Sequence, residues 1–91
     1  MGQAETQAQR VRRAILELVR ARGVGKTCCP SEVARQLEPE QWRDWIQPVR
    51  AVSCALVDEG ALVVTQKGNV VDARQARGAI RLGLPKGQDE G

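Results

Sequence analysis

The residues of this sequence that are best suited to bind a ligand are basic. Arginine and lysine side chains are cationic and donate several hydrogen bonds, which makes them the usual partners of phosphate groups. Four such residues are spread over positions 67–81, and a fifth lies at position 50, within a predicted helix. The five candidate nucleic-acid contacts are Lys67, Arg74, Arg77, Arg81 and Arg50. Their chemistry predicts contact with the phosphate backbone of a nucleic acid.

The formal net charge of +3 is unevenly distributed along the chain. Residues 1–26 and 61–86 each carry a net charge of +4, residues 27–60 carry −3 and residues 87–91 carry −2. Nucleic-acid binding requires positive charge where the phosphates lie, which favours the segment 61–86. An acidic face between two basic segments is also suited to self-association or to a protein partner. The sequence leaves both open: weak nucleic-acid binding, or a protein-interaction or dimerisation module.

Residue types that carry catalysis or bind metal ions are scarce. The sequence has no histidine, and Cys28 and Cys29 are adjacent, without the two-residue gap typical of zinc ligands. No nucleophile has a recognisable base nearby. The run Gly25-Lys26-Thr27 lacks the glycine five positions earlier that a phosphate-binding P-loop needs. We therefore predict no enzymatic activity, no metal and no cofactor.

The adjacent cysteines have one alternative role. They immediately precede a predicted helix, and a helix N-terminus stabilises the thiolate form of a cysteine. Oxidant sensing by Cys28 or Cys29 is therefore a hypothesis, and the simpler interpretation is that they are small apolar side chains of the interior. Three cysteines with two adjacent make a poor disulfide framework and suit a reducing compartment.

The N-terminal half must supply helices that hold a small core. Apolar residues recur at helical spacing from about residue 6 to residue 22, with Thr6 as the N-cap and Gly23 at the end. A short strand is expected near residues 26–28, and a second helix opens at Pro30, because proline at the first helical position needs no donor. A short helix after residue 39 places Trp42 and Trp45 on one side, where they are expected to fill the core.

The organising element is a helix over residues 48–60 that leads into a strand. Proline disfavours the helical conformation of the residue before it, so the helix is expected to begin at Pro48. Its apolar stripe consists of Val49, Val52, Leu56 and Val57. Its opposite face is short and nearly neutral, and only Arg50 could reach a base edge. After a strand at 62–64 come a turn at 66–69, a single helical turn after Asp72 and a strand at 79–84.

This order predicts an α+β fold, mainly α: a winged helix-turn-helix with a three-helix core, a short helix and a two- to three-stranded antiparallel wing. Residues 7–85 are expected to form the domain, with disordered ends at 1–6 and 86–91. No apolar run approaches the roughly 20 residues that span a bilayer. The start of the chain has no apolar core of a secretory signal. We therefore expect a cytoplasmic protein that does not bind membranes.

Several short motifs form a specific combination. They are T-C-C-P-S-E-V-A-R at 27–35, the pair Trp42-Arg43, V-R-A-V at 49–52, V-T-Q-K-G at 64–68, the pair Val71-Asp72 and R-G-A-I-R-L at 77–82. In these motifs, over about residues 9–85, the chain resembles a bacterial family of small uncharacterised winged-helix domains. That family has proline where this chain has Ala73 and Ala79. The resemblance implies the winged-helix fold and no established activity.

Overall fold

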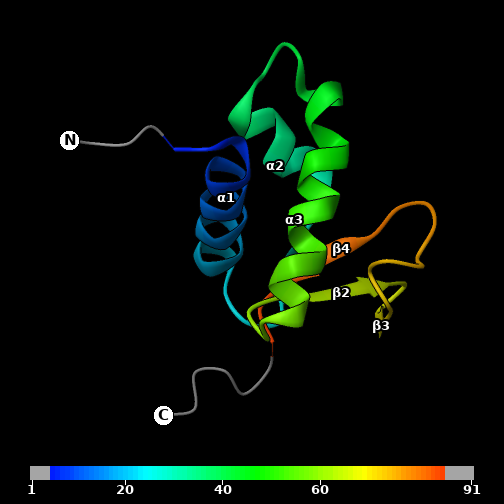
Figure 1. Cartoon of the computed structure of the whole chain (residues 1–91). Coiled ribbons are helices and arrows are strands. Elements are labelled where there is room, and N and C mark those ends of the chain that lie inside the picture. Colours follow the sequence, from blue (N-terminus) through cyan, green and yellow to red (C-terminus); the bar gives the residue numbers. More distant parts are fainter. Residues whose placement is uncertain (1–4, 86–91) are drawn as a thin grey trace.

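A computed structural model describes residues 5–85 of the chain. This part of the protein is α+β and mainly helical (Figure 1). Its elements are α1 (Gln7–Arg22), β1 (Thr27–Cys28), α2 (Pro30–Leu37), the 3-10 helix η1 (Trp42–Trp45), α3 (Ile46–Asp58), β2 (Val63–Gln66), β3 (Asn69–Val70) and β4 (Arg81–Gly83). The expected disordered ends fall mostly on residues 1–4 and 86–91, which lie outside the described residues.

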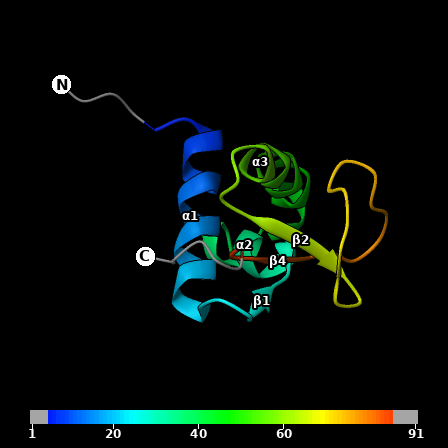
Figure 2. The same ribbon diagram turned by 90° about the horizontal axis from the view of Figure 1, so that it is seen from below.

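The strands form one antiparallel sheet in the order β1-β4-β2-β3. The last strand of the described residues, β4, lies between β1 and β2: its Leu82 pairs with Cys28 of β1 on one side and with Val64 of β2 on the other. The sheet lies across one end of the helices, and Figure 2 shows it from that end. None of the helices in residues 5–85 has the length and apolar character needed to cross a membrane.

The core draws on every layer of the fold. Its fully buried side chains come from all three α-helices and the strands: Val11, Ile15, Val19, Val33, Ala34, Val49, Leu56, Leu62, Val64, Ile80 and Leu82 are among them. On α3 the buried face is Val49, Ser53 and Leu56, whereas Val52 and Val57 of the expected stripe are only partly buried. Burial of Ser53 is tolerated because its hydroxyl donates a 2.8 Å hydrogen bond to the carbonyl of Val49.

The ends of the first two helices confirm the sequence signals. Thr6 caps α1, and Thr6 and Gln9 exchange side-chain to backbone hydrogen bonds in a capping box. Gly23 closes the helix with φ of 91°, a conformation that costs glycine little. Pro30 is the first residue of α2, as expected.

The start of α3 differs from the prediction. The helix begins at Ile46, two residues before the predicted start at Pro48, so the proline lies within the first turn of the helix. The first turn of a helix has N–H groups without intrahelical acceptors, and a proline there loses no hydrogen bond. The short helix is likewise a 3-10 helix over Trp42–Trp45 that runs directly into α3.

The two tryptophans pack against the edge of the core instead of filling its centre. Both are only partly buried. Arg10 lies 5.2 Å from the centroid of the Trp45 ring. Two further guanidinium groups, from Arg35 and Arg43, lie 4.3 and 4.4 Å from the centroid of Trp42. These distances fit cation–π contacts, which occupy arginines that the sequence alone would leave exposed.

A hairpin and a loop project from the sheet beside α3. The β2–β3 hairpin, which the sequence predicted only as a turn, places Gln66 opposite Asn69. Lys67 and Gly68 form its two-residue turn with φ of 52° and 83°, as in a type I′ turn. Residues 71–80, here called the 71–80 loop, then return to β4. Asp72 organises its single turn by accepting a 2.9 Å hydrogen bond from the Arg74 N–H.

Candidate nucleic-acid interface

Arg50 is engaged within the protein. Its guanidinium donates two hydrogen bonds of 3.1 Å, to the carbonyl oxygens of Ala76 and Gly78. The side chain is half-buried, and it joins α3 to the 71–80 loop. The structure therefore gives Arg50, predicted to reach a base edge, a structural contact inside the domain.

Arg74 is paired with an acidic residue of α3. Its two terminal nitrogens lie 3.0 and 2.7 Å from the carboxylate oxygens of Asp58. Both side chains are more than half exposed. The hydrogen bonds from Arg74 lower the pKa of Asp58 below its ordinary value, so the carboxylate is ionised at neutral pH. In the free protein the charge of Arg74 is thus balanced locally.

Arg81 lies at the start of β4 and bridges to β1. Its Nε donates a 2.9 Å hydrogen bond to the hydroxyl of Thr27, and a terminal nitrogen lies 3.3 Å from the carbonyl oxygen of the same residue. Both partners are neutral, so the positive charge of Arg81 is not cancelled. The residue remains exposed.

Lys67 and Arg77 are the two candidates that the fold leaves open. Both are exposed, and within residues 5–85 no hydrogen bond or ion pair involves either charged group. Together with Arg81 they line one open groove between the hairpin and the 71–80 loop. Its lining residues are Gln66, Lys67, Asn69, Val71, Arg77, Ala79 and Arg81. We call it the hairpin groove.

Gln66 fixes the shape of this groove. Its side-chain nitrogen donates hydrogen bonds of 2.7 and 3.1 Å to the carbonyl oxygens of Arg77 and Ala79. These two hydrogen bonds join the hairpin to the 71–80 loop along the groove. The sequence predicted Gln66 and Asn69 only as the ends of a turn and not as site residues, because the loop carbonyl groups that Gln66 bonds are 11 and 13 residues away.

The fold divides the five predicted contacts into two groups. Lys67, Arg77 and Arg81 share the hairpin groove, on one side of the 71–80 loop. Arg50 and Arg74 line a second groove, between that loop and α3. The structure therefore does not unite all five in one surface.

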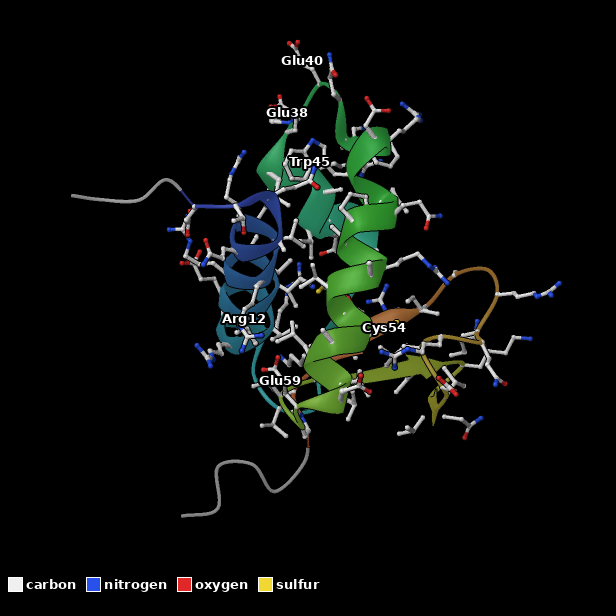
Figure 3. All side chains as sticks on the ribbon, in the orientation of Figure 1. Arg12, Glu38, Glu40, Trp45, Cys54 and Glu59 are labelled. Atoms are coloured by element: carbon white, nitrogen blue, oxygen red, sulfur yellow. The ribbon has the colours of Figure 1, made fainter. Side chains whose placement is uncertain are left out.

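Two of the five arginines of α1 pair with glutamates of the acidic central segment, residues 27–60. Arg12 forms two hydrogen bonds, of 2.9 and 2.6 Å, with the Glu59 carboxylate. Arg22 pairs with Glu32, which also accepts a 3.2 Å hydrogen bond from the N–H of Cys29. Hydrogen bonds from these arginines lower the pKa values of Glu32 and Glu59 below those of an ordinary glutamate. With Asp58, three of the six acidic side chains of this segment therefore pair with arginines of the domain itself. Two other acidic residues of this segment, Glu38 and Glu40, lie at the end of the molecule away from the sheet (Figure 3) and form no ion pair among residues 5–85.

The two adjacent cysteines occupy different environments. Cys28 is buried, and burial raises the pKa of its thiol to about 11. The hypothesis of an activated thiolate is therefore wrong for Cys28. Cys29 is the N-cap residue of α2, half-buried, with its sulfur 3.0 Å from the Ser31 hydroxyl. The described part of the chain contains no group of three potential metal-ligating side chains.

Thiol alkylation should separate these environments. In the native protein at pH 8, we expect iodoacetamide to modify Cys29 and Cys54 at least about tenfold faster than Cys28, because Cys28 is buried and its raised pKa leaves little of the reactive thiolate. Peptide mass spectrometry against time measures the three rates, and the denatured protein provides the control in which they converge. Equal rates for Cys28 and Cys29 in the native protein would contradict the burial of Cys28.

A comparison with curated proteins finds no match. The model of a family described as "Protein of unknown function (DUF3253)" matches residues 8–85, from the start of α1 to the end of the described residues. The match thus covers the helices and strands of residues 5–85 except the first residue of α1, and the chain belongs to this family of proteins of unknown function.

Proposed function

We propose that this chain is a small winged-helix module that binds nucleic-acid backbones weakly and without sequence preference through the hairpin groove. The order of elements supports the winged-helix interpretation: α1-β1-α2-α3 is followed by a hairpin and by β4, which pairs between β1 and β2. In this interpretation the β2–β3 hairpin and the 71–80 loop form the wing. Fold alone does not establish function, so the proposal rests on the groove.

The observation that carries the proposal is the position of Lys67 and Arg77. Both side chains are exposed, neither has a counter-charge among residues 5–85, and they line the same groove as Arg81. Cations that are free to exchange small counterions for phosphates supply the affinity of non-specific nucleic-acid binding. Contacts of this kind fix position on the backbone and carry no sequence information.

The outer face of α3 does not favour reading of bases. Arg50 is bonded to the 71–80 loop, and Arg74 is paired with Asp58. The rest of this face consists mainly of Ala51, Cys54 and Ala55, whose short side chains offer few hydrogen-bonding groups to a base edge, and Gln47 is its one long amide side chain. Sequence-specific recognition through α3 is therefore not part of the proposal.

An experiment on the hairpin groove tests this function. We expect random-sequence duplex DNA and single-stranded RNA, followed by fluorescence anisotropy, to bind the wild-type protein and to dissociate steeply between about 50 and 200 mM salt. The double variant Lys67→Ala/Arg77→Ala should weaken binding at least about tenfold at low salt and reduce the salt slope by about 2, one for each lost phosphate contact.

The matched control is Arg20→Ala/Lys26→Ala, which removes the same charge from two exposed positions that do not line the hairpin groove and, like Lys67 and Arg77, have no ion-pair partner among residues 5–85. Thermal unfolding should show that both double variants fold. An equal loss of affinity in the two would mean that net charge, not the groove, causes binding. Absence of binding at low salt would overturn the proposal.

One observation favours the alternative, a protein-interaction module. Val70 on β3 is 73% exposed, at a groove on the outer face of the sheet that also includes Val63 and Leu84. Exposed apolar side chains beside a groove are typical of protein contacts. Salt-dependent nucleic-acid binding discriminates between the two functions, because the alternative does not require it.

A further inference from the structure

The second groove, between α3 and the 71–80 loop, has the features of an anion site. It is lined by Gln47, Arg50, Ala51, Cys54, Ala73, Arg74 and Ala76. Cys54 lies on the side of α3 that faces the loop (Figure 3). Most of the lining side chains are short and uncharged, so a bulky anion can approach the two arginines closely.

Arg50 and Arg74 differ in their hydrogen-bond partners and in their exposure to solvent. Arg50 is half-buried and holds two backbone carbonyl groups, which are part of the fold. Arg74 holds only the carboxylate of Asp58, and the side chains are 56% and 58% exposed. Exposed ion pairs contribute little to stability, so an external anion can replace one partner at small cost.

The geometry of the Arg74–Asp58 pair indicates which anion fits. Two nitrogens of one guanidinium face two oxygens of one carboxylate, at 3.0 and 2.7 Å. Arginine binds two oxygens of a phosphate group with the same planar, two-point geometry. Two oxygens of a phosphate group can therefore make the same two contacts with Arg74 that the Asp58 carboxylate makes.

We propose that the groove between α3 and the 71–80 loop is a second phosphate-binding position, in which Asp58 occupies Arg74 until a backbone phosphate displaces it. The proposal rests on the nucleic-acid binding proposed above and adds its regulation: Asp58 acts as an internal competitor that lowers affinity. Asp58 is also the last residue of α3, where the negative end of the helix dipole disfavours a carboxylate. Its removal should therefore not harm the helix.

The loop keeps its position without Asp58. Arg50 still bonds Ala76 and Gly78, and Gln66 still bonds Arg77 and Ala79. Asp58→Asn should therefore release Arg74 while leaving both grooves in place.

Glu59 provides a control one residue away. Glu59→Gln changes the net charge by the same amount as Asp58→Asn, and it also breaks a two-point arginine pair. Its partner Arg12 belongs to α1, and the labelled Arg12 and Glu59 lie together on the α1 side, apart from Cys54 (Figure 3). A difference between the two variants is therefore a property of the groove and not of net charge.

The test is the anisotropy titration of random duplex DNA at about 50 mM salt with both variants. We expect Asp58→Asn to increase affinity about three- to tenfold and to steepen the salt slope by about 1, the signature of one added phosphate contact. Glu59→Gln should change affinity less than about twofold. Adding Arg74→Ala to Asp58→Asn should remove the gain.

The possible outcomes separate this inference from the proposed function. Equal affinities of Asp58→Asn and Glu59→Gln, with binding by the wild type, would overturn the inference and leave the function standing. A gain that survives Arg74→Ala would also overturn it. If only the Asp58→Asn variant binds, the result would support the inference that Asp58 competes for Arg74, and it would overturn the proposal that the wild-type protein binds nucleic acid. Absence of binding by every variant would overturn both.

Discussion

Leu56→Ala is expected to lower the free energy of unfolding by about 2–5 kcal/mol, the range found when a buried leucine is truncated and leaves a cavity. Leu56 is fully buried at the third position of the inner face of α3, after Val49 and Ser53. This helix contacts α1, α2 and β2, so a cavity there weakens the packing of several elements at once. Small domains have little stability in reserve, and such a loss is a large fraction of it.

Urea denaturation followed by tryptophan fluorescence measures the effect, since Trp42 and Trp45 lie at the edge of the core. The control is Val70→Ala, which removes an apolar side chain that is 73% exposed and should cost less than about 0.5 kcal/mol. Val57→Ala, at a partly buried position of α3, should fall between the two. A loss below about 1 kcal/mol for Leu56→Ala, or a larger loss for Val57→Ala, would show that another face of α3 is buried.

The elements themselves could be predicted because their signals are local. Thr6, Gly23 and Pro30 act on residues within one turn of themselves, and the structure confirms each. Ser53 escaped prediction because a serine is usually outside, and only its bond to the Val49 carbonyl, one turn earlier, permits burial. Strand β3 escaped because two residues carry no periodicity, and only pairing with β2 defines them.

The candidate site could be predicted only as a set of residue types. The partners that decide which cations are free come from distant positions: Arg12 pairs with Glu59 across 47 residues, and Arg74 with Asp58 across 16. No spacing rule in a sequence reports such pairs. The sequence therefore presents the acidic central segment as a candidate partner surface, and the structure adds that two of its glutamates, Glu32 and Glu59, pair with arginines of α1.

Arg50→Ala is expected to lower the free energy of unfolding by about 1–2 kcal/mol, because it removes two charge-assisted hydrogen bonds and leaves two carbonyl oxygens without their donor. Those carbonyls belong to Ala76 and Gly78, so the loss should be felt in the 71–80 loop before the core. Amide hydrogen exchange should accelerate in this loop and stay unchanged in α1. The matched variant is Arg77→Ala, which removes an equal charge from the same loop and should change stability by less than about 0.5 kcal/mol.

The same two variants decide between the structural contact of Arg50 and its predicted contact with a base. If Arg50 holds the 71–80 loop, Arg50→Ala accelerates amide exchange of this loop in the free protein. Any loss of nucleic-acid affinity is then accompanied by that faster exchange. If Arg50 contacts nucleic acid directly, affinity falls while exchange and stability match the wild type. The two hydrogen bonds of 3.1 Å favour the first result. In that case α3 would contribute to binding chiefly by positioning the 71–80 loop, and the free cations Lys67 and Arg77 would carry the affinity.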